Sequence, residues 1–373
     1  VYLFTRNVTK ALSVLMVDFS CALKLSMPVS VLSAIREANE YNVTVKGGKF
    51  MEAMAEADTI VFDKTGTLTK ATPTVVDVVS FDGRSSDELL RIAACMEEHF
   101  PHSMAKAVVD AAKERRLEHE EMHSKVEYIV AHGISTTIEG RKAIIGSYHF
   151  VFEDEKCVIP DGMEERFASL PEECSQLYLA IENKLSAVIC IEDPVRDEAA
   201  DVIRQLKEAG IRKVVMMTGD SERTARAIAE RVGVDEYYAE LLPADKVTHL
   251  EELLKTKPSG KTLAYVGDGI NDAPVLKRAD VGIAMGGLGS DAAIEAADVV
   301  LMDDDPRKIA LAMKIARHTI HVAHENVVFA IGVKVAVLIL ATVGLGTMWM
   351  AVFADVGVTV LAVLNAMRTL KKK

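Results

Sequence analysis

A long apolar stretch lies near the C-terminal end of the chain. Residues 327–366 contain only two charged side chains, Lys334 and Asp355, and are broken at Gly344-Leu-Gly346. About 20 apolar residues are enough for a helix to cross the hydrocarbon core of a bilayer. The pattern therefore predicts a helical hairpin with two membrane crossings, preceded by an amphipathic lead-in from residue 309.

A second apolar stretch covers residues 11–35 and is interrupted by Asp18, Lys24 and Pro28. It is long enough to span a bilayer, and charges or a proline inside a span usually mark a functional path. We expect a transmembrane helix kinked at Pro28. The core helix of a soluble protein would give the same pattern and remains the alternative.

Between these stretches, short apolar runs alternate with helical periodicity. Such alternation predicts a parallel sheet with helices on both faces. The predicted buried strands are Thr59–Phe62, Lys213–Met217, Thr262–Val266, Val281–Ala284 and Val299–Met302, with helices near residues 221–232, 244–254 and 271–279.

Residues 72–190 break this rhythm. Helices near 86–96 and 103–116 are followed by alternating segments, among them Gln176–Glu182 and Leu185–Ile191, joined at Asn183-Lys184. We expect a separate α+β domain with an antiparallel sheet, inserted into the parallel one.

The predicted fold class is therefore α/β, with an inserted α+β domain and transmembrane helices. The parallel-sheet domain is expected in two parts, and the insertion lies between them. The predicted segments are a transmembrane helix with a cytoplasmic extension (1–46), the first part of the sheet domain (47–71), the insertion (72–190), the second part (191–308) and the lead-in with two transmembrane helices (309–373).

The net charge and the cysteine pattern argue against several classes of protein. The formal net charge of −12 argues against a nucleic-acid partner, because phosphate backbones require clustered Lys and Arg. The five cysteines are scattered without a CxxC pair, which excludes a zinc ribbon or a thioredoxin-like motif and fits a reducing cytosol.

Arg368 and the three terminal lysines follow the last predicted span, so the positive-inside rule places the C-terminus in the cytoplasm. Two crossings return the chain to its starting side, and residues 36–325 should therefore also be cytoplasmic. The chain starts at Val1, and its first span would begin on the far side of the membrane. We therefore expect an upstream part of the same polypeptide.

One seven-residue string offers a nucleophile. Asp63-Lys-Thr-Gly-Thr-Leu-Thr69 directly follows the predicted strand Thr59–Phe62. A carboxylate at the C-terminal end of a parallel strand lies where such sheets bind ligands, and the small residues after it leave backbone amides free to face a phosphate. Asp63 is then placed to attack a γ-phosphoryl group. If only Asp63 and its nearest neighbours are considered, an Asp that caps a turn is the alternative to a nucleophile.

Three further motifs follow later strands. Thr218-Gly-Asp220 offers a hydroxyl and amides to phosphate oxygens, and Lys246 can neutralise charge on a transferring group. Gly267-Asp268-Gly-Ile-Asn271-Asp272 offers two carboxylates four residues apart, and such hard oxygen ligands suit Mg²⁺. Each motif alone could be a helix cap or a solvated lysine. All four in this order, each at a strand end, indicate phosphoryl transfer.

Together these motifs resemble the haloacid dehalogenase superfamily and, within it, the heavy-metal-transporting (type IB) P-type ATPases. The resemblance covers essentially the whole chain and implies that ATP phosphorylates Asp63. Phosphatases of the superfamily typically carry a second Asp two residues after the nucleophile, as general acid and base. Here that position is Thr65. The resemblance thus implies a phosphoenzyme that persists, as a pump requires.

The resemblance assigns further residues to this site. Thr218 and Lys246 would hold the phosphoryl group, and Asn271 and Asp193, the latter in Asp193-Pro-Val-Arg196, match neighbouring positions. The residues implied to serve Mg²⁺ are Asp63, Thr65, Asp268 and Asp272.

The inserted domain is implied to hold the nucleotide. Family members place adenosine against a Glu, a His-Pro pair and glycine-containing turns. Ser103 replaces the Pro here and Ala131 replaces the first Gly of a G-x-G, although Gly133 still allows close backbone approach. The matching residues are Glu97, His102, Gly133 and Gly146.

The transported ion is implied to bind within the membrane. The family usually carries Cys-Pro-Cys in the span before the phosphorylation site, whereas this chain has Phe19-Ser20-Cys21. Lys334 and the string Asp355-Val-Gly357 instead resemble the zinc, cadmium and lead exporters. Our hypothesis is a mixed site of Cys21, Asp355 and Asp18, with Lys334 expelling the ion or balancing charge. The alternative is that these charges only form structural ion pairs. The predicted spans contain two carboxylates and two ammonium groups (Asp18, Asp355, Lys24 and Lys334), whose charges sum to zero.

Three functions remain open. The leading one is ATP-driven export of a divalent heavy metal across the plasma (inner) membrane, and oxygen-rich ligation leaves manganese, iron(II) and cobalt open as cargo. The others are a membrane-tethered phosphatase and a truncated, inactive or regulatory partner subunit. The family's actuator domain normally lies upstream of residue 1. We therefore expect this chain by itself to bind ATP but not to complete a transport cycle.

Overall fold

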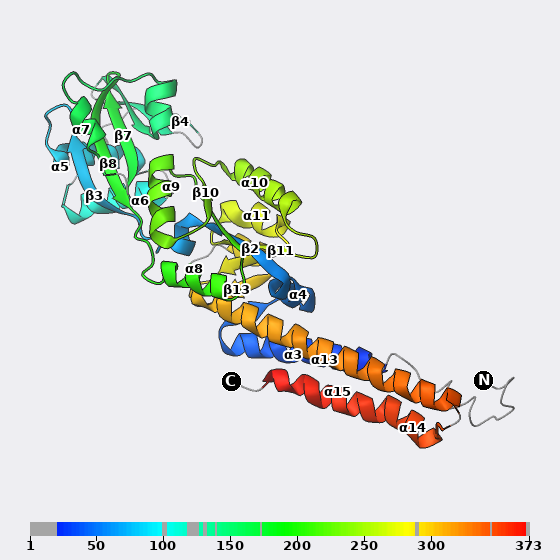
Figure 1. The fold of residues 1–373 in the computed structure, drawn as a ribbon. Helices are drawn as coiled ribbons and strands as arrows, with labels where there is room; N and C mark the ends of the chain where they lie inside the picture. Colours follow the sequence, from blue (N-terminus) through cyan, green and yellow to red (C-terminus); the bar gives the residue numbers. More distant parts are fainter. Residues whose placement is uncertain are drawn as a thin grey trace. The chain divides into compact units, whose positions relative to one another are not determined.

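The computed structural model describes residues 21–98, 103–117, 127–129, 133–138, 140–171, 174–287, 291–343 and 345–370 (Figure 1). Asp18, His102 and the first part of the stretch at 11–35 lie outside these residues. The chain forms two compact units. The first unit comprises Val1–Ile60, Gln205–Arg212 and Leu250–Lys373, and the second comprises Val61–Arg204 and Lys213–His249.

The parallel sheet that the sequence predicts is present, with seven strands in the order β1-β13-β12-β11-β2-β9-β10. β12 pairs in parallel with β11 and with β13, and β10 pairs in parallel with β9. β12 is buried at every position, which explains its continuous apolar character, and β2 is equally buried although it also contains Asp58, Thr59 and Asp63. The strands are β1 (Val43–Val45), β2 (Ala57–Asp63), β9 (Lys213–Met217), β10 (Glu236–Tyr238), β11 (Thr262–Gly267), β12 (Val281–Met285) and β13 (Val299–Leu301).

The two edge strands of this sheet are not predicted by the sequence pattern. β1 runs antiparallel to β13, with Val43 opposite Leu301. β10 is half-buried throughout, so it lacks the apolar run that identifies an inner strand. Each has only three residues, which is too short for a periodic signal.

Among the helices that connect these strands along the chain, α9, α10 and α11 agree with the predicted helical periodicity, whereas the sequence pattern does not predict α4, α8 and α12. Ser221 caps α9 by accepting a hydrogen bond from the Thr224 backbone amide, and the left-handed Gly233 ends it. The connecting helices are α4 (Gly48–Glu56), α8 (Ala199–Glu208), α9 (Glu222–Val232), α10 (Pro243–Thr256), α11 (Ala273–Arg278) and α12 (Asp291–Ala296), with short turns at η1 (Lys64–Leu68) and η3 (Ile270–Asp272).

The second unit contains a six-stranded antiparallel sheet in the order β3-β8-β7-β6-β5-β4, which confirms the predicted insertion of an α+β domain. One apolar core joins the sheet to α5 (Ser86–Glu97) and α6 (Ser103–Glu114). A separate core contains Phe150 and Val151 of η2 (His149–Asp154), and Phe167 of α7 (Glu164–Ala168) packs against it. The strands are β3 (Thr74–Ser80), β4 (Glu127–Ile129), β5 (Gly133–Ile138), β6 (Arg141–Gly146), β7 (Ser175–Ile181) and β8 (Lys184–Glu192).

Two details of this sheet refine the sequence analysis. The turn between β7 and β8 is Glu182-Asn183, not Asn183-Lys184, because Lys184 already pairs with Ile181. Glu182 and Asn183 have φ values of 50° and 62°, as a two-residue turn with matching twist requires. Cys190 lies inside the core, and burial raises the pKa of its thiol to about 12, which suits a structural cysteine.

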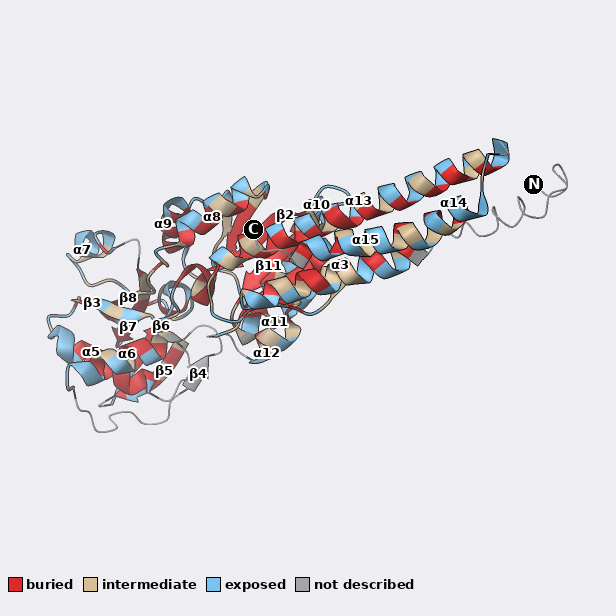
Figure 2. Cartoon of the chain, turned by 90° about the horizontal axis from the view of Figure 1, so that it is seen from below, coloured by how far each residue is buried: buried red, intermediate tan, exposed pale blue. Residues whose placement is uncertain are grey.

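Three long helices of the first unit lie side by side in both views (Figures 1 and 2). They share a small core of Ala22, Ala330, Val358 and Ala362, whose small side chains allow close packing. The first two are α3 (Cys21–Glu40) and α13 (Arg307–Val343). The third consists of four consecutive elements, which are α14 (Met348–Val352), η4 (Phe353–Gly357), α15 (Val358–Ala366) and η5 (Met367–Leu370).

Within the described residues, two helical stretches are long and apolar enough to cross a membrane. These are Arg307–Val343, with a mean hydropathy of 2.3, and Met348–Thr369, with 1.9. Val343 is 70% exposed and Trp349 is 82% exposed, whereas the core helix of a soluble protein would bury such side chains. Figure 2 shows exposed residues along both helices. The hairpin turn falls after Val343, where the sequence predicts it.

Gly133 of β5 lies very close to the Ile145 backbone of β6 and to the Phe150 ring. It lies opposite Gly146 in the β5–β6 ladder. A Cβ atom at Gly133 would lie 2.4 Å from the carbonyl oxygen of Ile145 and 2.4 Å from the Phe150 ring. The packing of these strands therefore requires a glycine here.

We predict that Gly133→Ala destabilises the protein by about 1–3 kcal/mol, because neither contacting group can move away without disturbing the sheet. Thermal unfolding in detergent, followed by circular dichroism, measures the change. Gly47→Ala is the control, since its Cβ would lie 3.6 Å from Phe50, an ordinary contact. Equal unfolding temperatures for the two variants would contradict the packing argument.

Candidate active site

Asp63 is the last residue of β2 and is buried, with 5% of its surface exposed. Its Oδ1 atom accepts a hydrogen bond from Nζ of Lys246, which lies in the first turn of α10 and is also buried. The ammonium group compensates the charge of the carboxylate and can neutralise charge on a group that binds beside it. The structure thus brings together the predicted nucleophile and the predicted cation.

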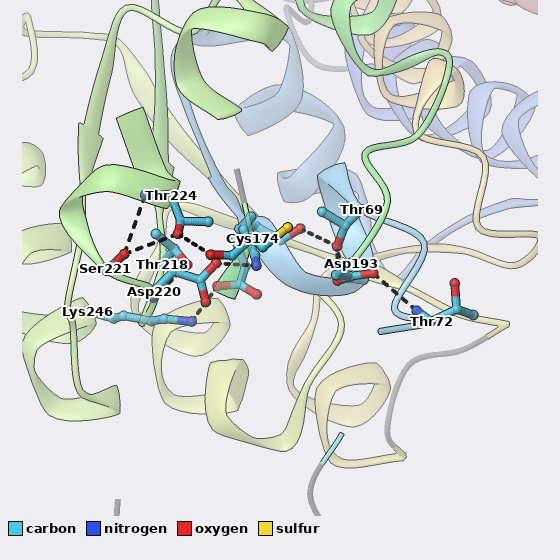
Figure 3. A network of polar contacts seen from close by, with 12 residues as sticks. Thr69, Thr72, Cys174, Asp193, Thr218, Asp220, Ser221, Thr224 and Lys246 are labelled. Atoms are coloured by element: carbon cyan, nitrogen blue, oxygen red, sulfur yellow. Dashed lines mark hydrogen bonds and ion pairs between the residues drawn. The ribbon is translucent and has the colours of Figure 1, made fainter. Parts of the chain in front are cut away.

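The loop after Asp63 is fixed by side-chain contacts (Figure 3). Gly66 has a φ of 71°, a conformation that favours glycine. Thr69 Oγ1 accepts a hydrogen bond from the Gly66 amide at 3.1 Å and donates one to Asp193 Oδ2. Asp193 Oδ1 accepts from the Thr72 amide at 3.2 Å. Asp193 therefore anchors the backbone that directly follows the turn with the half-buried Thr65, at Thr69 and at Thr72.

Arg196 holds the same loop from the other side. Its Nε atom donates to the Thr69 carbonyl at 3.0 Å, and its Nη2 atom donates to the Gly66 carbonyl at 3.1 Å. Sequence reasoning gave Arg196 no role of its own. Its position three residues after Asp193 was the available signal.

Thr218 and Asp220 follow β9. Thr218 is buried, and its Oγ1 atom accepts a hydrogen bond from the Asp220 amide at 3.1 Å. Asp220 Oδ2 accepts from Nζ of Lys64, which is itself buried. This second ion pair joins the residue after Asp63 to the loop after β9, and the sequence analysis did not anticipate it.

Asp268 and Asp272 belong to the first unit and follow β11. Asp272 is buried, and its carboxylate accepts from Tyr265 Oη at 2.9 Å and from the Gly269 amide at 3.3 Å. A Cβ atom at Gly267 would lie 2.9 Å from this carboxylate, so the glycine lets Asp272 fold back toward the strand end. Asp268 is half-buried and Asn271 is exposed.

The predicted nucleotide residues are partly described. Glu97 is buried in the last turn of α5, which packs against β5. Gly133 and Gly146 lie directly opposite each other. His102 lies outside the described residues.

Of the four residues predicted for the transport site, two lie close together in the structure. Lys334 of α13 lies 3.5 Å from Asp355 Oδ1 in η4, and Lys334 is buried among the helices. Asp18 lies outside the described residues, and Cys21 begins α3 with its side chain outside them. Nearby, Asn326 donates to the Ala362 carbonyl at 3.1 Å, a polar contact between helices.

Comparison with known proteins now bears on this site. A sequence model described as haloacid dehalogenase-like hydrolase matches residues 57–280. A zinc-transporting ATPase of Synechocystis sp. is 42% identical over 98% of this chain and 49% of its own length, and a cadmium, zinc and cobalt-transporting ATPase of Bacillus subtilis is 43% identical over 98% and 51%.

A solved structure agrees with the sequence relatives. The crystal structure of a zinc-transporting PIB-type ATPase in the E2.Pi state superposes with a TM-score of 0.72 at 34% identity, over 98% of this chain and 58% of that one. The chain spans about half the length of the curated relatives it matches. It belongs to the haloacid dehalogenase-like hydrolases, and along 98% of its length it is similar to metal-transporting P-type ATPases.

Proposed function

We propose that this chain is the phosphorylated and membrane-spanning portion of an ATP-driven exporter of a divalent heavy-metal ion. The observation that carries the proposal is the buried pair of Asp63 and Lys246 at the end of β2. The names of the relatives favour zinc or cadmium as cargo, and the Bacillus subtilis relative adds cobalt. In this proposal the membrane is the plasma (inner) membrane, with residues 36–325 and the C-terminus in the cytoplasm.

Asp63 is proposed to attack the γ-phosphorus of ATP. A bond forms between a carboxylate oxygen and phosphorus, the bond from phosphorus to the bridging oxygen breaks, and ADP leaves with the electron pair. Lys246 neutralises charge on the transferring group, and Thr218 offers a hydroxyl to its oxygens. Arg196 and Asp193 act indirectly by fixing the loop from Gly66 to Thr69.

The donor set fits Mg²⁺. Asp63, Asp268 and Asp272, with Thr65, would supply hard oxygen ligands, and the sheet order makes β2 and β11 neighbours. An ion held by these residues would reduce the charge repulsion between their carboxylates and a phosphate group. Asp272 is already oriented by Tyr265 and Gly269, so it need not reorganise. Asn271 would contact the same region.

ATP is proposed to bind the inserted domain through Glu97, His102, Gly133 and Gly146. Gly133 also has a packing role, because a Cβ atom there would meet Ile145 and Phe150. The transported ion is proposed to bind Asp355 together with Cys21 and Asp18. The buried ammonium of Lys334 lies near Asp355 and would compete with the cation for that carboxylate.

We further propose that an upstream part of the same polypeptide completes the transporter, and the partial coverage of the relatives supports this. A membrane-tethered phosphatase is disfavoured because Thr65 replaces the general acid that such enzymes use. A regulatory subunit would have no need for a buried nucleophile that is paired with Lys246.

We predict acid-stable, hydroxylamine-sensitive labelling of membranes from γ-labelled ATP, stimulated by Zn²⁺ or Cd²⁺. Co²⁺, Mn²⁺, Fe²⁺, Pb²⁺ and Cu⁺ are tested singly beside them. Asp63→Asn should reduce the label to background, since an amide cannot form the acyl phosphate. Asp197→Asn, an identical change at an exposed position, should keep it. Equal labelling with every metal would refute a metal exporter.

Arg196→Lys should slow labelling of Asp63 about tenfold, because an ammonium group cannot donate to two fixed carbonyls as the guanidinium does. Rapid-quench labelling at saturating ATP measures the rate. Arg212→Lys is the matched control, since the Arg212 side chain is 73% exposed. Unchanged rates in both variants would show that Arg196 does not position the loop.

Asp355→Asn should raise the Zn²⁺ concentration needed for half-maximal labelling by tenfold or more, on the order of the effect of losing one metal ligand contact. The measurement is the metal dependence of labelling at fixed ATP. If the intramembrane charges only form structural ion pairs, the variant will lose thermal stability while its metal response stays unchanged.

A further inference from the structure

A stacked pair of rings connects β10 to α10, the helix that carries Lys246. Tyr238 is the last residue of β10 and His249 lies in α10, and their ring centroids are 4.5 Å apart with 30° between the planes. Both residues are half-buried. Rings in contact gain stability beyond the apolar area that they cover, and the contact restricts the two backbones that carry them. Neither ring has a role in the site described above.

The backbone of Tyr238 supports the loop after β9. Its carbonyl accepts a hydrogen bond from the Thr218 amide at 3.0 Å. The chain after Tyr238 follows the same loop. The Leu241 amide donates to the Thr218 carbonyl at 3.1 Å, and the Glu240 amide donates to the Asp220 carbonyl at 2.8 Å. The position of Thr218 therefore depends on the segment that begins at Tyr238.

His249 belongs to the helix on the other side of the contact. It lies three residues after Lys246, so the two side chains occupy neighbouring positions on one side of α10. Lys246 donates from Nζ to Asp63 and from its amide to the Leu242 carbonyl, the latter at 3.1 Å. The stack with Tyr238 thus meets α10 about one helical turn from Lys246.

A further contact orients the Tyr238 ring. Its Oη atom donates a hydrogen bond to Glu236, and the same carboxylate pairs with Lys213. The hydrogen bond from Lys213, and then the one from Tyr238, hold the pKa of Glu236 below its usual value, so this carboxylate stays an ionised acceptor at neutral pH. The ring that stacks on His249 is therefore held both by its backbone and by its hydroxyl group.

We infer that Tyr238 and His249 are positioning residues for phosphoryl transfer, and that their stack sets the spacing between Thr218 and Lys246. The proposed function gives these two residues contacts to one phosphoryl group, and groups that act on one reacting centre must be held to within about 0.5 Å. The stack joins the strand end that holds Thr218 to the helix that carries Lys246. The inference deepens the proposed function and rests on it for the identity of the transferred group.

The first test is rapid-quench labelling of Asp63 at saturating ATP. His249→Gln removes the ring and should slow labelling about tenfold, less than the ~100-fold cost of misplacing a reacting group by about 1 Å. His249→Phe keeps a planar ring and should restore most of the rate. The ATP concentration for half-maximal rate should stay unchanged, since the proposed nucleotide residues lie in the inserted domain. His318→Gln, the identical change at an exposed position of α13, is the matched control and should keep the original rate.

Orthovanadate, an analogue of the transferring phosphoryl group, gives a second readout that needs no ATP. Its dissociation constant is measured by equilibrium dialysis of the full chain in detergent with Mg²⁺. The constant should rise about tenfold in His249→Gln and return toward the original value in His249→Phe. Thermal unfolding on the same preparations shows whether each variant is folded.

The inference is overturned if His249→Gln matches the His318→Gln control in both readouts, even with a lower unfolding temperature, because the stack would then serve stability alone. Equal defects in the Gln and Phe variants would also overturn it, since a retained ring would then have no effect. If the unmodified chain is not labelled from ATP with any metal, the proposed function fails, and the vanadate constants still test the stack. Absence of vanadate binding to the unmodified chain would contradict the inference itself.

Discussion

The second unit depends on two ion pairs, the buried pair of Asp63 with Lys246 and the partly buried pair of Lys64 with Asp220. Removing two charges from water costs several kcal/mol for each ion, and the attraction between them offsets this cost only when the geometry is good. Loss of one partner would leave an uncompensated charge, an effect of about 3–5 kcal/mol. The end of β2, the loop after β9 and the start of α10 are therefore fixed relative to one another by electrostatics as well as by packing.

This constraint explains why so many backbone contacts surround the loop after Asp63. A nucleophile at a strand end is useful only if the backbone that follows it leaves room for phosphate. Asp193 and Thr69 hold that backbone through side-chain contacts (Figure 3). Arg196 adds hydrogen bonds to two of its carbonyls. These contacts restrict the conformations of the loop, so its backbone groups are already oriented before a ligand binds.

The sequence predicts features that are local and misses those that arise when distant segments meet. Asp63, Thr218 and Asp268 directly follow apolar runs, so their places at strand ends could be inferred. The Lys64–Asp220 pair joins residues 156 positions apart, and no spacing rule reveals it.

The role of Gly133 and the two edge strands also depend on contacts between distant segments, which the sequence pattern does not reveal. Gly133 looks like a nucleotide-binding residue, but its closest neighbours are Ile145 and Phe150, whose positions follow from the β5–β6 ladder and η2. β1 and β10 are too short for periodicity and form only because inner strands offer an unpaired edge. The membrane hairpin was predictable because length and hydropathy alone decide it.

Arg317 binds the carbonyl of Ala57, the first residue of β2, and Lys334 lies 17 residues later on the same uninterrupted helix. An α-helix is stiff along its axis, so a shift of β2 along its own direction must either break this hydrogen bond or displace α13 as a whole. About 25 Å of continuous helix separates the two side chains. A displacement that begins at the first residue of β2 can therefore reach the buried ammonium of Lys334 without any intervening hinge.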